Sequence, residues 1–283
     1  MILEFLESWT LFSQTYISAL LIGASLSLMG VVVVARGNIF VAAALAQASV
    51  LGVALSLFFE IGQPVLSAVL CSVGASLLVS RKHQEGGVST SEEITGWIFL
   101  AGGSLSVLLL ARMPYGLKEI QSLFSSSIIG ASSADIIVFG VLLFVFVGFL
   151  TLRMRRLTLY LSDPVMAAAV GANIILWSIV ISSALGLVTG LAIRSSGMLF
   201  TFGSMILPAQ MAKIMCRNIS GMFLVAPLMA IFCVMLGLML GNYYDLPPAQ
   251  TVVALMCFLL VLTWVLRWVF DYVFLVSKSS GDS

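Results

Sequence analysis

Long apolar runs, separated by short polar stretches, dominate the sequence. A bilayer core about 30 Å thick needs about 20 mostly apolar residues in a helix to cross it. Nine runs approach or reach that length, at residues 16–35, 39–58, 62–80, 94–112, 134–152, 173–193, 197–212, 219–241 and 251–276. They lack the strict alternation of barrel strands, and lipid cannot satisfy free backbone groups, so we predict helices.

The expected fold class is therefore all-α: a polytopic transmembrane helix bundle of about nine membrane segments, in one domain over residues 1–283. The seventh run is short and contains Gly203 and Pro208. We expect it to be a short or broken span, which membranes tolerate where the backbone faces protein or a cavity.

Composition supports this prediction and excludes several classes of protein. Hydrophobic residues are 61% of the chain and charged residues only 9%, whereas a soluble domain is about 25% charged. The net charge of +1 says little about partners, and no basic block indicates nucleic acid, so membrane lipid is the surroundings that the apolar composition predicts. The four cysteines form no CxxC pair, so neither a disulfide frame nor a metal site or other cofactor is expected.

Basic residues indicate the orientation in the membrane. Nine crossings place the two termini on opposite sides. With the C-terminus inside, nine basic residues fall inside: Arg36, Arg81, Lys82, Arg153, Arg155, Arg156, Lys213, Arg217 and Lys278. Three fall outside, Arg112, Lys118 and Arg194, and Arg267 stays unassigned near a span end. This asymmetry predicts an outer N-terminus and an inner C-terminus, with the serine-rich segment Ser122–Ser133 as an outer loop or re-entrant piece.

Several catalytic signatures are missing from the sequence. It contains no GxxxxGK[ST] phosphate-binding loop and no HExxH motif, and its one histidine, His83, stands beside Arg81 and Lys82 in a polar loop. Ionisable residues within the spans are too few for a proton relay. We therefore do not expect the chain to be an enzyme, to hydrolyse ATP by that route or to pump protons.

Three stretches and a later segment carry a recognisable pattern: Arg36–Ala54, Ser162–Ala172, Gly197–Lys213 and, at a distance, Tyr243–Val253. In order and spacing they resemble the permease subunit of bacterial ABC importers for zinc, manganese and iron. The third stretch is the most specific, because the family pattern falls without a gap on Gly197, Pro208, Ala209, Ala212 and Lys213.

The resemblance implies a multi-pass permease of the bacterial cytoplasmic (inner) membrane, with three kinds of partner. A separate ABC ATPase subunit hydrolyses ATP, a second permease, the same or different, completes the path, and an extracytoplasmic substrate-binding protein delivers the cargo. The alternatives left open are a gradient-driven secondary transporter and a membrane subunit without a transport path.

By resemblance, the second stretch holds the coupling helix that docks on the ATPase, with Asp163, Pro164, Ala167 and Gly171 on the family pattern. The residues themselves predict a short inner helix, since Asp163 can cap it and Pro164 is tolerated in its first turn. Its small residues suit docking into a cleft. Without the resemblance, a plain capped interfacial helix explains it equally well.

The first stretch departs from the family. Where the family has Asp and His four residues apart on one helical face, this chain has Ala43 and Gln47. We expect these two positions beside the translocation path, but no strong metal site in this subunit. Either a different second permease supplies the ligands, or the substrate has changed to a chelated or neutral species. A third possibility is that Gln47 only forms a helix–helix hydrogen bond.

Overall fold

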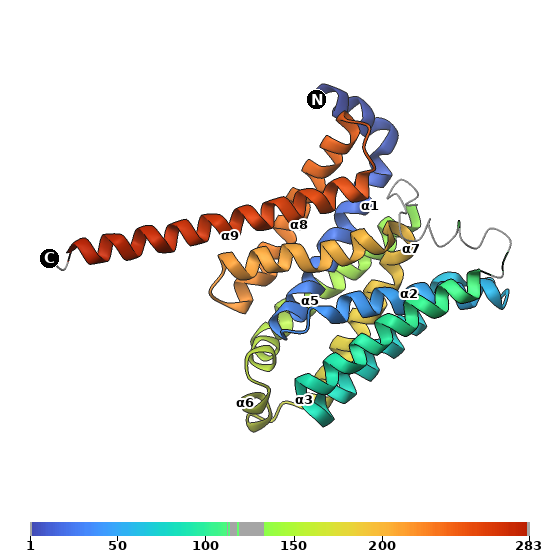
Figure 1. Cartoon of the computed structure of the whole chain (residues 1–283), viewed down its shortest axis with the longest axis horizontal. Coiled ribbons are helices and arrows are strands. Elements are labelled where there is room, and N and C mark those ends of the chain that lie inside the picture. The colour runs from blue at the N-terminus through green and yellow to red at the C-terminus, as the bar shows by residue number, and fades with distance from the viewer. Residues whose placement is uncertain (1, 112, 114–117, 119–132, 282–283) are drawn as a thin grey trace.

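The computed structural model describes the backbone of residues 2–111, 113, 118 and 133–281. Every regular element in this part of the chain is a helix (Figure 1). The helices are α1 (Ile2–Ala35), α2 (Phe40–Phe58), α3 (Pro64–Leu110), α5 (Ser133–Ser162), α6 (Pro164–Ala169), α7 (Ile174–Met215), α8 (Ile219–Tyr243) and α9 (Pro248–Gly281). The all-α membrane bundle is confirmed, with eight helical stretches long and apolar enough to span a membrane. The serine-rich segment lies outside the described residues up to Ser133, where α5 begins.

Helix α3 contains two crossings. Ser67 and Gly102 would be about 50 Å apart on a straight helix with a rise of about 1.5 Å per residue. Both nevertheless contact the middle of α2: a Cβ added to Gly52 would overlap the Ser67 carbonyl, and one added to Gly102 would lie 3.0 Å from the Gln47 carbonyl oxygen. The chain therefore reverses inside α3, and its halves, Pro64–Arg81 and Ser91–Leu110, are the third and fourth expected spans.

Helix α7 also doubles back, at Gly197. Ser182 lines a cavity with Arg36, and Lys213 lines a pocket with Val34, so both parts of α7 reach the same end of α1. Gly197 between them has φ 78° and ψ 166°, a conformation essentially restricted to glycine. The sixth and seventh expected spans are thus two crossings joined at a glycine, which makes nine crossings among the residues that the structure describes.

Two details of the prediction were wrong. The break is at Gly197 itself and not at Gly203 or Pro208, around which the backbone stays helical. Residues 82–93 and 153–162, which the expected spans leave as loops, continue α3 and α5 as helix. The reason is that a helix can continue beyond the end of its apolar run. Arginine is a good helix former, so Arg153, Arg155 and Arg156 extend α5 beyond the apolar part of the membrane.

Contacts among the helices show which residues lie at each end of the bundle. We call the end that holds Arg36, Tyr160 and Lys213 the basic end. The opposite end holds Asp135, whose carboxylate accepts a 2.6 Å hydrogen bond from Ser195. Arg267, which the sequence left unassigned, donates to the Ile214 carbonyl and so belongs to the basic end. Which end faces the cytoplasm stays a prediction from charge.

Small residues let the helices approach closely in the core, as is usual in membranes. A Cβ on Gly30 of α1 would overlap the Met205 carbonyl of α7, and one on Gly190 would lie 2.7 Å from the Val69 Cα of α3. Helices α1, α2 and the second half of α7 form the buried centre, whereas the C-terminal half of α9 (red in Figure 1) extends away from the bundle.

Candidate functional site

The two positions expected beside the path are both buried within this subunit. Ala43 is 8% exposed and Gln47 is 5% exposed. Gln47 lies between α2 and the second half of α3, where a Cβ on Gly103 would be 3.3 Å from its side-chain oxygen. The glycine pair Gly102–Gly103 thus makes the space that Gln47 occupies.

The amide oxygen of Gln47 has no hydrogen-bond partner among the described residues. A buried polar group left unpaired costs about 1–3 kcal/mol, so this oxygen is a ready acceptor in an apolar helix interface. Taken alone it is a poor site for a metal ion. The described part of the chain contains no group of three His, Cys, Asp or Glu side chains that could hold one.

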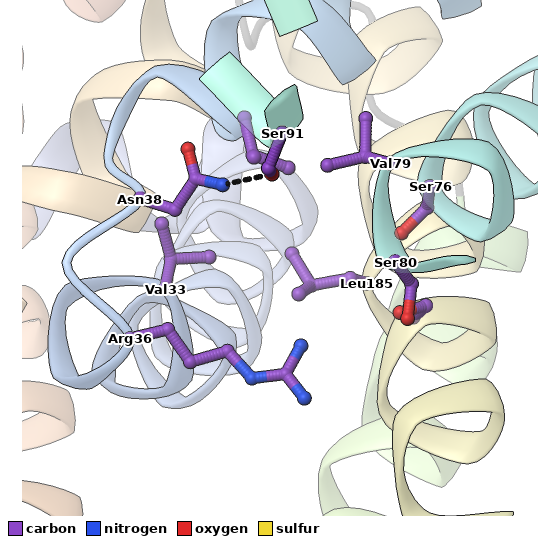
Figure 2. A pocket seen from close by; sticks show the side chains of 10 residues that line it. Val33, Arg36, Asn38, Ser76, Val79, Ser80, Ser91 and Leu185 are labelled. Atoms are coloured by element: carbon purple, nitrogen blue, oxygen red, sulfur yellow. Dashed lines mark hydrogen bonds between the residues drawn. The ribbon is translucent and has the colours of Figure 1, made fainter. Parts of the chain in front are cut away.

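A second polar region lies nearer the basic end (Figure 2). A cavity of about 40 Å³ opens between the end of α1, the start of α2, both halves of α3 and α7. In Figure 2, Asn38 donates a 2.8 Å hydrogen bond to the Ser91 hydroxyl, and Ser76 and Ser80 lie on the other side of the cavity. The side-chain amide oxygen of Asn38 is buried without a partner among the described residues. The size and lining suit ordered water.

The side chain of Arg36 gives this cavity a positive charge. Its guanidinium donates to the Tyr160 hydroxyl and lies 5.1 Å from the centre of the Tyr160 ring. Tyr160 in turn stacks on Trp177, with ring centroids 6.2 Å apart. Burial lowers the pKa of Arg36 from its ordinary value, and Tyr160 acts in the opposite direction. A half-buried guanidinium repels cations, so this cavity is unsuited to a bare metal ion.

Helix α6 has the capped geometry that its residues predict. The Asp163 carboxylate accepts hydrogen bonds of 3.0 Å from the backbone N–H groups of Val165 and Met166. At the other end, the N–H of Ala172 donates to the Ala167 carbonyl and that of Gly171 to the Ala168 carbonyl. This is a Schellman motif, and Gly171 supplies its left-handed residue with φ 83°.

The exposed face of α6 keeps part of the small-residue surface expected from the sequence, since Ala168 and Ala169 are exposed. Ala167 is fully buried in the core formed with α5 and α7. The large apolar side chains exposed on α6 and its C-cap are Val165, 80% exposed, Met166, 56% exposed, and Val170, 72% exposed. Sequence reasoning missed these three, although apolar residues in a polar inner segment were a visible signal.

The third stretch is a packing motif with one exposed end. Pro208, Ala209 and Ala212 are buried, and Ala209 lies against Gly30 of α1. Lys213 is exposed beyond them. The stretch therefore holds the returning half of α7 against α1 and ends with a cation at the basic end.

Comparison with known proteins agrees with this architecture. Residues 8–267 match the model of a family described as the ABC 3 transport family. The chain is 25% identical over 250 residues to the high-affinity zinc uptake system membrane protein ZnuB of Haemophilus influenzae, across 87% of this chain and 95% of that protein. It is 22% identical over 251 residues to the manganese transport system membrane protein MntC of Listeria monocytogenes, across 89% of each.

A solved structure shows the same fold. PsaBC from Streptococcus pneumoniae in complex with Fab superposes with a TM-score of 0.80 at 18% identity, over 93% of this chain and 95% of that one.

Proposed function

The chain belongs to the ABC 3 transport family, and from this premise we propose that it is the permease through which an ATP-driven importer moves a divalent transition metal. Membership confirms the resemblance seen in the sequence and makes the chain a multi-pass permease subunit of a bacterial ABC transporter. The observation that carries the proposal is the family match over residues 8–267, since it covers the first eight crossings and most of the ninth.

The choice of cargo rests on the relatives. ZnuB is named for zinc uptake and MntC for manganese transport, and zinc or manganese is therefore the first cargo to test, with iron after them. A bare divalent ion cannot cross hydrocarbon. The path must consequently open to one side at a time, which requires an energy source and partner subunits.

ATP hydrolysis is assigned to a separate subunit, because this sequence has no phosphate-binding loop. We assign its docking to α6. The apolar side chains of Val165, Met166 and Val170 project into an aqueous layer where they gain by being covered. The cap at Asp163 and the Schellman motif at Gly171 stiffen this short helix, so that motion in the ATPase can be transmitted to α5 and α7.

We assign the metal ligands mainly to a second, different permease. In this subunit Ala43 offers a methyl group and Gln47 a single neutral oxygen, which is too little to replace the hydration shell of a divalent ion. A partner with carboxylate and imidazole at the shared path would complete the site. An extracytoplasmic binding protein delivers the cargo at the Asp135 end.

The test is transport by the reconstituted complex. The chain is co-purified with its partner permease and ATPase, placed in proteoliposomes with the binding protein, and assayed for ATP-dependent uptake of radiolabelled zinc and manganese. Uptake that requires ATP supports the proposal. Uptake of a metal chelate but no free metal indicates a changed substrate, and uptake driven by an ion gradient without ATP refutes the importer.

The position of the path is tested separately by rebuilding the ligands. The double substitution Ala43→Asp with Gln47→His should make the isolated subunit bind zinc, because the two groups then share the face of α2 that we place beside the path. The matched control is Val41→Asp with Leu45→His, which has the same spacing about half a turn around the helix. Equal binding by the two variants, or none by either, would argue against a path beside residues 43 and 47.

A further inference from the structure

A pocket of about 410 Å³ lies at the basic end of the bundle, between the end of α1, the end of α7 and the middle of α9. This volume is within the range of ligand sites, about 300–1,000 Å³. Its deeper wall is apolar and includes Val34 and Leu260, and its outer edge is formed by Val261 and Trp264. Val261 is 60% exposed and Trp264 71% exposed, so the pocket opens on the outer surface of α9.

One end of this pocket is cationic. Lys213 lines it and forms no hydrogen bond or ion pair with the residues that the structure describes. The lining residues include no carboxylate. Arg267 stands one turn beyond the pocket and donates to the Ile214 carbonyl, which belongs to the last turn of α7 and has no helical partner. The charge of Lys213 is therefore left without a counter-charge from the lining.

Aromatic side chains mark the level of this pocket in the membrane. Trp264 and Trp268 follow each other at the spacing of one helical turn, and Trp268 stacks on Tyr272 with centroids 5.9 Å apart. Tryptophan and tyrosine collect where hydrocarbon meets headgroups. The apolar wall thus lies at acyl-chain depth and Lys213 at headgroup depth.

We propose that this pocket binds an anionic phospholipid, with its phosphate on Lys213 and an acyl chain along Leu260 and Val261. Charge favours a lipid over a second copy of this chain. A two-fold contact through the pocket would bring two Lys213 ammonium groups together with no carboxylate between them. The inference does not depend on which cargo is transported.

Native mass spectrometry of the full chain, purified from membranes, tests the proposal with two defined lipids. The wild type should retain palmitoyl-oleoyl phosphatidylglycerol in preference to phosphatidylcholine with the same chains. Lys213→Gln should lower retention of phosphatidylglycerol about fivefold, the effect of one basic residue at an anionic surface. Leu260→Trp should lower the retention of both lipids by filling the apolar wall.

Two controls separate a defined site from general surface effects. Arg153→Gln removes a cation outside the pocket, and Leu262→Trp adds the same bulk two residues away on α9. Both should retain lipid like the wild type. Equal losses in Lys213→Gln and Arg153→Gln, or no preference between the lipids, would overturn the proposal. A Val261→Cys variant that forms a disulfide between subunits in membranes would also overturn it, because protein would then cover the pocket.

Discussion

Removing the two most N-terminal apolar side chains of α6 should uncouple the ATPase from the permease. The perturbation is Val165→Ser with Met166→Ser. Full burial of a valine or methionine side chain is worth about 1.5–3 kcal/mol. Val165 is 80% exposed and Met166 56% exposed in the free subunit, so covering both can contribute about 2–4 kcal/mol. A serine side chain still buries part of the contact area, so we expect the two substitutions to cost about 1–2 kcal/mol of binding free energy. This corresponds to a five- to thirtyfold weaker affinity for the ATPase.

The assay is a titration of purified ATPase subunit against the permease in nanodiscs, followed by ATP-driven transport. A control pair, Ile137→Ser with Val141→Ser, removes exposed apolar side chains from α5 near the Asp135 end, where the two residues are 67% and 57% exposed. The control should bind the ATPase like the wild type. Unchanged affinity and unchanged transport in the α6 variant would refute the docking role of this helix.

Ala167 makes a different prediction from its exposed neighbours. Because it is fully buried, Ala167→Leu should overpack the contact of α6 with α5 and α7 and cost about 1–3 kcal/mol of stability. Thermal unfolding in detergent measures this loss. A bulky residue at this position therefore tests the fold of the segment and not the docking surface.

Three further outcomes are expected. Gly30→Ala should lower the unfolding temperature sharply, because its added Cβ would overlap the Met205 carbonyl. The control Gly74→Ala should leave the unfolding temperature unchanged, because nothing lies within 4 Å of its added Cβ. Equal effects of the two substitutions would contradict the close packing of α1 on α7. Gly197→Ala should cost about 1–3 kcal/mol, because its φ of 78° with ψ of 166° excludes a side chain; an unchanged unfolding temperature would argue against the reversal. A reporter fused after Lys278 should be active only in the cytoplasm, and an outside signal would invert the topology.

Sequence alone was sufficient for features that depend on short stretches of chain. The apolar runs identified every crossing, since hydropathy reports the transfer of each segment into lipid. Asp163 and Pro164 predicted the start of α6, because capping involves only the first turn of a helix. The order of the motif stretches was enough to indicate the family.

Tertiary structure decided how each helix is turned about its axis. In a soluble protein, polar residues mark the outer face of a helix, but lipid is as apolar as a protein core. Apolar residues on both sides of a membrane helix therefore conceal which side is buried. For this reason the burial of Phe139 and the exposure of Phe144, both on α5, could not be read from their residue type.

The same limit applies to contacts between distant segments. Gln47 occupies space made by Gly102 and Gly103, which are more than 50 residues away in the chain. The reversal at Gly197 returns Lys213 to the end of α1, and α9 then completes the pocket beside it. Local sequence determined which segments enter the membrane. Long-range packing determined which polar atoms contact one another inside it, because each such contact requires two helices to be positioned together.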